Sequence, residues 1–101
     1  MQTGDKTLGN LVGQATLEIK NGDGLHMRPA MQFVERASTF ASRISVRKDG
    51  MAVDGKSIMQ LTMLAATQGT RLTIRAEGSD AAAAAAALGT LLEQLTSEST
   101  S

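Results

Sequence analysis

Hydrophobic and polar residues alternate along four stretches of the chain, a pattern typical of strands that bury one face. These stretches cover residues 15–20, 43–48, 51–54 and 71–76. Asp49-Gly50 separates the second stretch from the third and supplies residue types that tolerate the positive φ of a tight hairpin turn. We therefore expect four strands, of which the middle two form a hairpin.

Two further stretches show the spacing of long helices. The first helix should begin near residues 27–29, and its apolar positions follow at i, i+3, i+4 and i+7 as Ala30, Phe33, Val34 and Ala37. The last helix should begin at residue 81, capped by Ser79 or Asp80, because seven consecutive alanines favour helix. Its buried face is expected to hold Ala81, Ala84, Ala85, Leu88, Leu91, Leu92 and Leu95.

A short helix over residues 58–66 should follow Ser57. The Ser57 hydroxyl is expected to accept a hydrogen bond from the backbone N–H of Gln60, and the Gln60 side chain to reach back, as in a capping box. Gly69 suits the exit of this helix. On this interpretation Ser57 is a helix cap.

The elements follow the order β-α-β-β-α-β-α. Since every strand buries one face, the pattern predicts an α+β fold with an antiparallel sheet and helices on one side. The 101 residues fit one domain. We interpret residues 1–13 as a flexible N-terminal extension and residues 97–101 as a polar tail.

Composition excludes several classes of function. Ten Lys and Arg balance ten Asp and Glu, and with no Trp or Tyr and two Phe we expect no nucleic-acid binding. No cysteine and a single histidine argue against disulfides and metal sites. The chain shows neither a signal-peptide pattern nor the roughly 18–20 apolar residues of a membrane span. We expect a cytoplasmic protein with no cofactor and no membrane insertion.

Residues 24–30, Gly-Leu-His-Met-Arg-Pro-Ala, contain the single histidine and the single proline of the chain. His26 falls where extended chain gives way to helix. A neutral imidazole is a nucleophile near pH 7, and the first turn of a helix offers unpaired N–H groups to a phosphate. Arg28 adds a planar cation that suits phosphate oxygens. The combination predicts a histidine that accepts a phosphoryl group.

This segment resembles the phosphohistidine signature of HPr, the histidine-containing phosphocarrier family of the bacterial phosphoenolpyruvate-dependent sugar phosphotransferase system. Residues 55–61 resemble the regulatory-serine segment of the family, and residues 67–70 and 76–80 resemble further landmarks at the expected spacing. The resemblance covers residues 14–96, which we interpret as an HPr-like domain. Several motifs in order and in the right elements are far more specific than one.

The resemblance implies an open-faced β-sandwich, in which three helices cover one face of a four-stranded antiparallel sheet. It also implies that His26 takes a phosphoryl group at Nδ1 from enzyme I and passes it to a sugar-specific enzyme IIA. Arg28 would stabilise the phosphate. We expect a monomer that works as a component of the phosphotransferase system rather than as a stand-alone enzyme.

The resemblance also gives Ser57 a second role, as a regulatory phosphorylation site. An ATP-dependent HPr kinase/phosphorylase would modify it, and the phosphorylated form would act with a transcription factor in carbon-catabolite control. A phosphate at a helix N-terminus is electrostatically favourable and adds a charge of about −1.5 to −2. Capping and phosphorylation are therefore compatible roles for Ser57.

Methionines near the histidine have a further implied role. The resemblance implies that Met27, Ile58, Met59 and Thr62 form an exposed apolar patch beside His26 that docks several partners. Flexible methionine suits a surface that must fit different shapes. Met63 is instead expected to pack in the core.

Two alternatives to a sugar-branch carrier stay open. A regulatory binding module could act mainly through phospho-Ser57, although such a module would not need His26 and Arg28. A carrier for a nitrogen-related phosphotransferase branch would use the same chemistry with other partners. A hydrolase built on Ser57 and His26 is disfavoured, because no carboxylate is evidently placed to orient the histidine and the serine lacks a strained strand–turn–helix setting.

Overall fold

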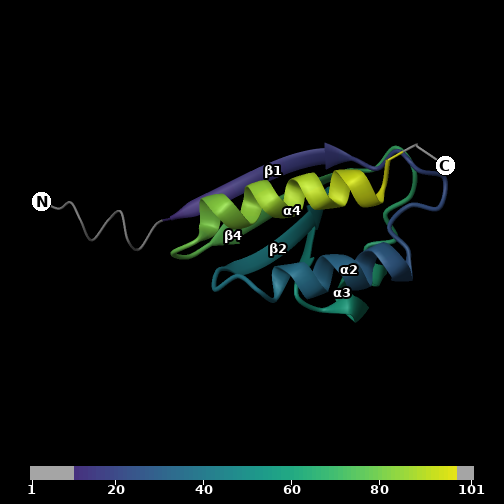
Figure 1. Ribbon diagram of the computed structural model, residues 1–101. Helices are drawn as coiled ribbons and strands as arrows, with labels where there is room; N and C mark the ends of the chain where they lie inside the picture. The colour runs from purple at the N-terminus through teal and green to yellow at the C-terminus, as the bar shows by residue number, and fades with distance from the viewer. Residues whose placement is uncertain (1–10, 98–101) are drawn as a thin grey trace, which may run out of the picture.

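The computed structural model describes residues 11–97 as four strands and three helices (Figure 1). The predicted order of elements is confirmed. Most of the expected N-terminal extension and of the polar tail lies outside the described residues. The elements are β1 (Val12–Glu18), α2 (Met27–Ala37), β2 (Arg43–Lys48), β3 (Met51–Asp54), α3 (Ile58–Met63), β4 (Arg71–Glu77) and α4 (Ala81–Leu95).

The four strands form one antiparallel sheet in the order β1-β4-β2-β3. Ile74 in the inner strand β4 pairs with Ala15 of β1 on one side and with Val46 of β2 on the other. Residues paired in this way point to the same face of a sheet. The predicted alternation is therefore confirmed, and the strand residues buried on the covered face are Leu17, Ile44, Val46, Val53, Leu72, Ile74 and Ala76.

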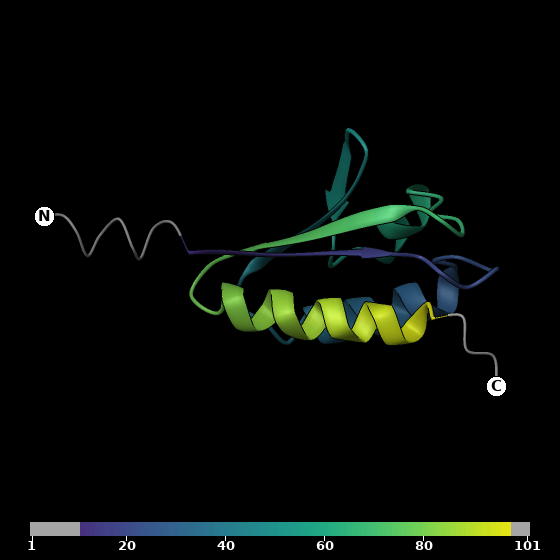
Figure 2. The ribbon, with the colours of Figure 1, turned by 90° about the horizontal axis from the view of Figure 1, so that it is seen from above.

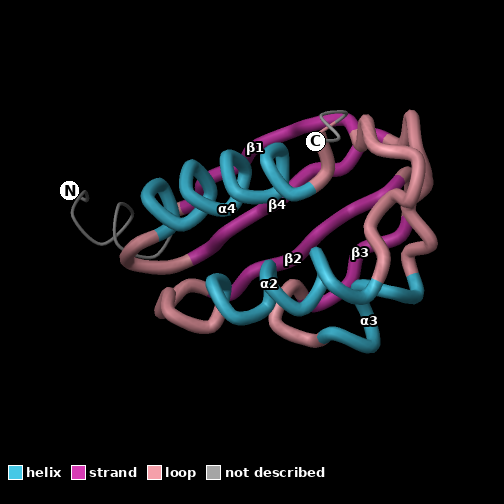
Figure 3. Tube along the Cα trace, turned by 45° about the vertical axis from the view of Figure 1, so that its right-hand side comes forward, coloured by secondary structure: helices cyan, strands magenta, loops and turns pink. Residues whose placement is uncertain are grey.

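Helices α2 and α4 lie on the same side of the sheet and contact each other (Figure 2). Helix α4 runs along β1 and β4 (Figure 3), while α3 packs against α2 and β3. Phe33 of α2 and Leu88 of α4 are fully buried in the shared core, and each such burial is worth about 1.5–3 kcal/mol. The predicted open-faced α+β sandwich is thus confirmed.

Helix α4 approaches β1 closely because small residues line the contact. A Cβ added to Gly13 would lie 2.5 Å from the carbonyl oxygen of Ala81, and one added to Gly89 would lie 2.8 Å from the Cβ of Ala15. Glycine in a helix costs about 0.5–1 kcal/mol relative to alanine. Here the close packing of α4 against β1, which Gly89 permits, offsets that cost.

The boundaries of three elements differ from the prediction, although β4 differs only by ending at Glu77 rather than at residue 76. β1 covers residues 12–18 rather than 15–20, because its pairing with β4 extends to Val12 opposite Glu77. Helix α3 ends at Met63 rather than near residue 66. Ala65 adopts a φ of 51°, which cannot continue a right-handed helix, and the Lys48 ammonium group donates to the carbonyl oxygen of Leu64 over 2.9 Å. Gly69 therefore does not form the exit of the helix.

Asp80 occupies the N-cap position of α4, but its side chain makes no capping hydrogen bond. Its carboxylate instead accepts hydrogen bonds from the backbone N–H groups of Ala41 (2.8 Å) and Ser42 (2.9 Å) and from the Ser42 hydroxyl. The predicted capping hydrogen bond is therefore wrong, although Asp80 does occupy the N-cap position. Asp80 joins the start of α4 to the loop between α2 and β2.

Candidate functional site

A tight turn between β1 and α2 positions His26 at the start of α2. The backbone N–H of Gly24 donates to the carbonyl oxygen of Asn21 (3.3 Å), and the Asn21 amide donates back to the carbonyl oxygen of Gly24 (3.3 Å). The backbone N–H of Leu25 donates to the carbonyl oxygen of Ala66 (2.9 Å), which attaches this turn to the chain that leaves α3. The turn is thus fixed to a second element one residue before His26.

Gly24 is required at this place. Its φ of 67° lies in the left-handed region, and a Cβ there would lie 2.3 Å from the carbonyl oxygen of Ala66. The side chain of the next residue, Leu25, is buried in the core. Together these features restrict the conformation of the backbone that precedes His26.

His26 is exposed and is the N-cap residue of α2, with extended backbone angles. Its Nδ1 lies 3.2 Å from the carbonyl oxygen of Gly24. A carbonyl oxygen only accepts, so this contact is a hydrogen bond when the proton is on Nδ1, and the lone pair then lies on Nε2. The ring therefore presents a nucleophilic nitrogen on the side away from Gly24.

The first turn of α2 offers positive charge beside the imidazole. The backbone N–H groups of Met27 and Arg28 have no acceptor within the helix, and Pro29 has no N–H to offer. The Arg28 side chain is exposed. In the part of the chain that the structure describes, the His26 ring has no hydrogen bond or salt bridge to a carboxylate.

Ser57 caps α3 as predicted in one respect and not in the other. Its hydroxyl accepts a hydrogen bond from the backbone N–H of Gln60 (3.2 Å). The Gln60 side chain, however, accepts from the backbone N–H of Asp54 (2.8 Å) rather than from that of Ser57. The reason is that the Ser57 N–H already donates to the carbonyl oxygen of Asp54 (3.2 Å). The reciprocal half of the capping box is therefore wrong.

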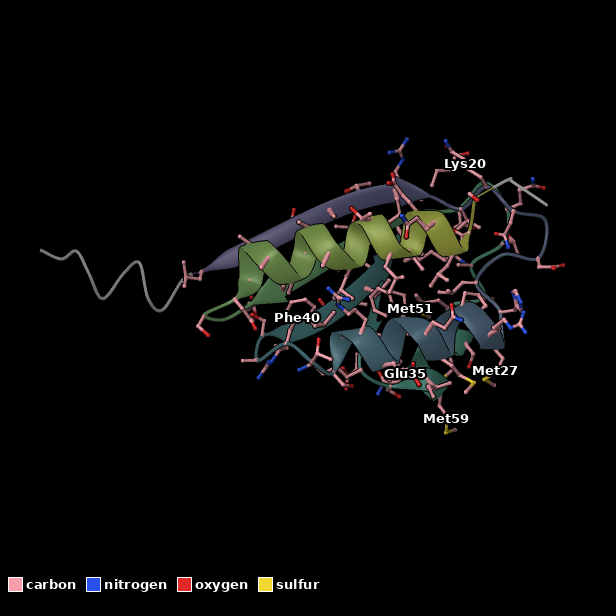
Figure 4. The ribbon with its side chains drawn as sticks, in the orientation of Figure 1. Lys20, Met27, Glu35, Phe40, Met51 and Met59 are labelled. Atoms are coloured by element: carbon pink, nitrogen blue, oxygen red, sulfur yellow. The ribbon has the colours of Figure 1, made fainter. Side chains whose placement is uncertain are left out.

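The predicted docking residues lie on α2 and α3, two helices that contact each other. Met27 is 53% exposed and Met59 is 76% exposed, and Figure 4 shows both on the same side of the molecule. Ile58 and Thr62 are half-buried. Met63, expected in the core, is 65% exposed, because α3 turns only Leu61 fully inward.

Sequence reasoning missed Met31. Its side chain is 46% exposed on α2, one helical turn after Met27. The spacing of four residues puts both side chains on one face of the helix and could have revealed the pair.

Within the described part of the chain, no three metal-binding side chains gather and no helix is long and apolar enough to span a bilayer.

The comparisons with known proteins establish the family of this chain. Residues 14–94 match the family model PTS-HPr, described as the PTS HPr component phosphorylation site. The chain belongs to the HPr family. Phosphocarrier protein HPr of Haemophilus influenzae is 50% identical over 63% of this chain and 75% of its own length. HPr of Borreliella burgdorferi is 44% identical over 74% of this chain and 87% of its own length.

Solved structures show the same architecture. The crystal structure of HPr-C-His from Thermoanaerobacter tengcongensis superposes with a TM-score of 0.78 at 45% identity, covering 86% of this chain and 98% of that one. An HPr dimer from the same organism superposes with a TM-score of 0.63 at 44% identity, covering 83% and 97%. The expected monomer thus stays a prediction for this protein.

A second group of relatives carries another name. The HPr-like protein Crh of Halalkalibacterium halodurans is 42% identical over 77% of this chain and 93% of its own length. Membership of the HPr family supports a phosphocarrier role in the phosphotransferase system.

Proposed function

We propose that His26 accepts a phosphoryl group from phosphorylated enzyme I and hands it to a sugar-specific enzyme IIA. The observation that carries this proposal is the placement of an exposed imidazole as the N-cap of α2, beside Arg28 and the unpaired N–H groups of the first turn. The HPr identity of the relatives supports the same role.

Phosphoryl transfer asks little covalent chemistry of a protein beyond an in-line nucleophile and stabilised equatorial oxygens. A neutral imidazole already has a lone pair, so His26 needs no general base. Arg28 supplies a fixed cation, and a helix N-terminus stabilises a nearby anion by about 0.3–1 kcal/mol at an exposed site. Such modest stabilisation suits a carrier, because the group must leave as readily as it arrives.

Enzyme I is the partner we assign to the apolar patch of Met27, Ile58, Met59 and Thr62. This patch spans α2 and α3, which contact each other, and its two methionines are well exposed; Met27 directly follows His26 in the chain. Enzyme IIA would then use the same surface in a second encounter. Unbranched thioether side chains adapt to two differently shaped partners more readily than branched ones.

The second proposed role is regulation through Ser57. The Crh relatives favour it, because Crh of Bacillus subtilis is described as a catabolite repression HPr. An ATP-dependent HPr kinase/phosphorylase would phosphorylate Ser57, and a catabolite-control transcription factor would read the product. The serine is half-buried at the N-terminus of α3, within the segment that bears Ile58 and Met59. A charge of about −1.5 to −2 at that point would repel a partner that docks on an apolar patch. A nitrogen-related branch would differ in partners only.

The test of the carrier role is intact-mass measurement after incubation with phosphoenolpyruvate and enzyme I. We expect the gain of one phosphoryl group, its loss in mild acid, and no gain in the His26→Ala variant. Continued labelling of that variant would exclude His26 as the acceptor. Incubation with ATP and an HPr kinase should instead give an acid-stable phosphate that the Ser57→Ala variant lacks.

A further inference from the structure

The exposed apolar side chains of this protein are almost all thioethers. In residues 11–97 the exposed large hydrophobics are Val12 and five methionines, which are between 46% and 76% exposed: Met27, Met31, Met51, Met59 and Met63. The sequence has no Cys, Trp or Tyr. Methionine is therefore the side chain that a peroxide reaches most readily on this surface.

Four of these methionines form two pairs on contacting helices. Met27 and Met31 lie one turn apart on α2, and Met59 and Met63 lie one turn apart on α3. Side chains spaced by four residues neighbour each other on one helix face. We call these four residues the methionine surface. Met51 belongs to neither pair, because it lies on β3, next to the hairpin turn.

We propose that the methionine surface is a reversible oxidation site that controls docking beside His26. The inference rests on the proposed function, because docking of enzyme I is what the oxidation would weaken. A sulfoxide turns a flexible apolar side chain into a polar one, and sulfoxides disrupt apolar interfaces that depend on methionine. None of the four side chains is in the buried core, so the fold itself would survive the change.

The chemistry is a two-electron oxygen transfer from a hydroperoxide. The methionine sulfur donates a lone pair to one peroxide oxygen, an S–O bond forms and the O–O bond breaks. With hydrogen peroxide, the second oxygen leaves as water after a proton shift. Sulfur is oxidised and the peroxide is reduced. A methionine sulfoxide reductase reverses the step: two thiols are oxidised to a disulfide, the sulfoxide is reduced to the thioether, and its oxygen leaves as water.

The test measures the rate at which phosphorylated enzyme I labels the full chain before and after treatment with hydrogen peroxide. Peptide mass spectrometry identifies which methionines carry oxygen, and circular dichroism checks that the fold persists. We expect kcat/KM for labelling to fall about tenfold, the size of effect seen when one well-packed docking contact is lost. Incubation with methionine sulfoxide reductases and a thiol should restore the original rate.

Two variants locate the effect. The variant carrying Met27→Leu, Met31→Leu, Met59→Leu and Met63→Leu is compared with itself before and after peroxide, and its rate should not change. Met51→Leu is the matched control, which should keep both the parent rate and the parent sensitivity. An unchanged rate in the parent despite sulfoxides at the four sites would overturn the inference, as would equal sensitivity in the fourfold variant. If the untreated parent is never labelled, the carrier role itself fails and the inference fails with it.

Discussion

The Nδ1 atom of His26 lies 3.2 Å from the carbonyl oxygen of Gly24. This contact links the His26 side chain to Gly24, the residue whose left-handed φ shapes the turn before it. In this orientation the neutral ring carries its proton on Nδ1 and its lone pair on Nε2. Phosphorylation at Nδ1, which the family resemblance implies, requires the ring to turn away from Gly24.

The first prediction concerns this tautomer. In the unphosphorylated protein, at a pH where His26 is neutral, the ring should be mainly protonated on Nδ1 because Gly24 accepts that proton. The 15N chemical shifts of the two ring nitrogens distinguish the tautomers directly. A ring protonated mainly on Nε2 would show that the contact with Gly24 does not form in solution.

Arg28 is predicted to act through the geometry of its guanidinium group as well as its charge. Arg28→Ala should lower the rate of labelling from phosphorylated enzyme I about 10–100-fold, the value of one or two charge-assisted hydrogen bonds. The labelling rate of Arg28→Lys should lie between those of the parent and of Arg28→Ala, since lysine keeps the positive charge but lacks the planar, bidentate guanidinium group. Urea unfolding of both variants should match the parent, because the side chain is exposed. An unchanged rate in Arg28→Ala would remove Arg28 from the site.

Gly24 is predicted to be intolerant of any side chain. Gly24→Ala should lower the free energy of unfolding by roughly 1–3 kcal/mol, because the φ of 67° and the approach of Ala66 both oppose a Cβ. Gly22→Ala is the control, since a Cβ there meets nothing within 4 Å. Urea titration of the two variants makes the comparison. Equal stability would mean that the turn has a different conformation in solution.

Asp80 is predicted to make stability depend on acid pH. The Ser42 hydroxyl, followed by the Ala41 N–H, lowers the pKa of the Asp80 carboxyl below its ordinary value of 3.8. A carboxyl whose pKa is depressed by folding stabilises the protein above its unfolded pKa, and this contribution disappears as the pH falls through the folded pKa.

Asp80→Asn should therefore be less stable than the parent at pH 7, and the difference should shrink below about pH 3.8. Glu77→Gln is the matched control, because the Glu77 salt bridge with Arg75 is exposed and such pairs contribute about 0–1 kcal/mol. Chemical unfolding at several pH values gives the two profiles. A difference between parent and Asp80→Asn that does not vary with pH would contradict the assignment.

Two substitutions at Ser57 are predicted to separate the effect of losing the helix cap from the effect of adding a negative charge. Ser57→Ala should lose about 1 kcal/mol of stability, because the hydrogen bond to the Gln60 N–H disappears. Ser57→Asp should keep a cap while placing a negative charge next to Ile58 and Met59, and it should slow labelling by enzyme I more than Ser57→Ala does. Thermal unfolding and labelling rates measure the two effects separately. If Ser57→Asp is labelled at the parent rate, charge at this position does not regulate docking.

Local patterns predicted the elements well where the chain itself determines them. Alternation placed β2 and β3 at their observed bounds, and Asp49 adopts the positive φ expected of the hairpin, although Gly50 does not. The first helix begins at Met27, within the predicted range. His26 and Arg28 emerged from residue chemistry and spacing alone.

Contacts between distant residues explain the errors. Helix α3 ends early, where Lys48 of strand β2 donates a hydrogen bond to the carbonyl oxygen of Leu64. This contact joins residues that are far apart in the sequence, so no local pattern could predict it. Asp80 has the right residue type for a cap, yet it bonds to Ser42 across the fold. Met63 was expected inside because methionine is apolar, whereas its exposure depends on which face of α3 meets α2 and β3.

The most direct test of a carrier is to follow the phosphoryl group through it. The phosphorylated protein is freed of enzyme I and phosphoenolpyruvate, mixed with enzyme IIA, and both proteins are weighed intact over time. We predict that IIA gains one phosphoryl group for each one that this protein loses, and that His26→Ala gives no transfer. A protein that accepts the group on His26 but loses it only to water would contradict the carrier role.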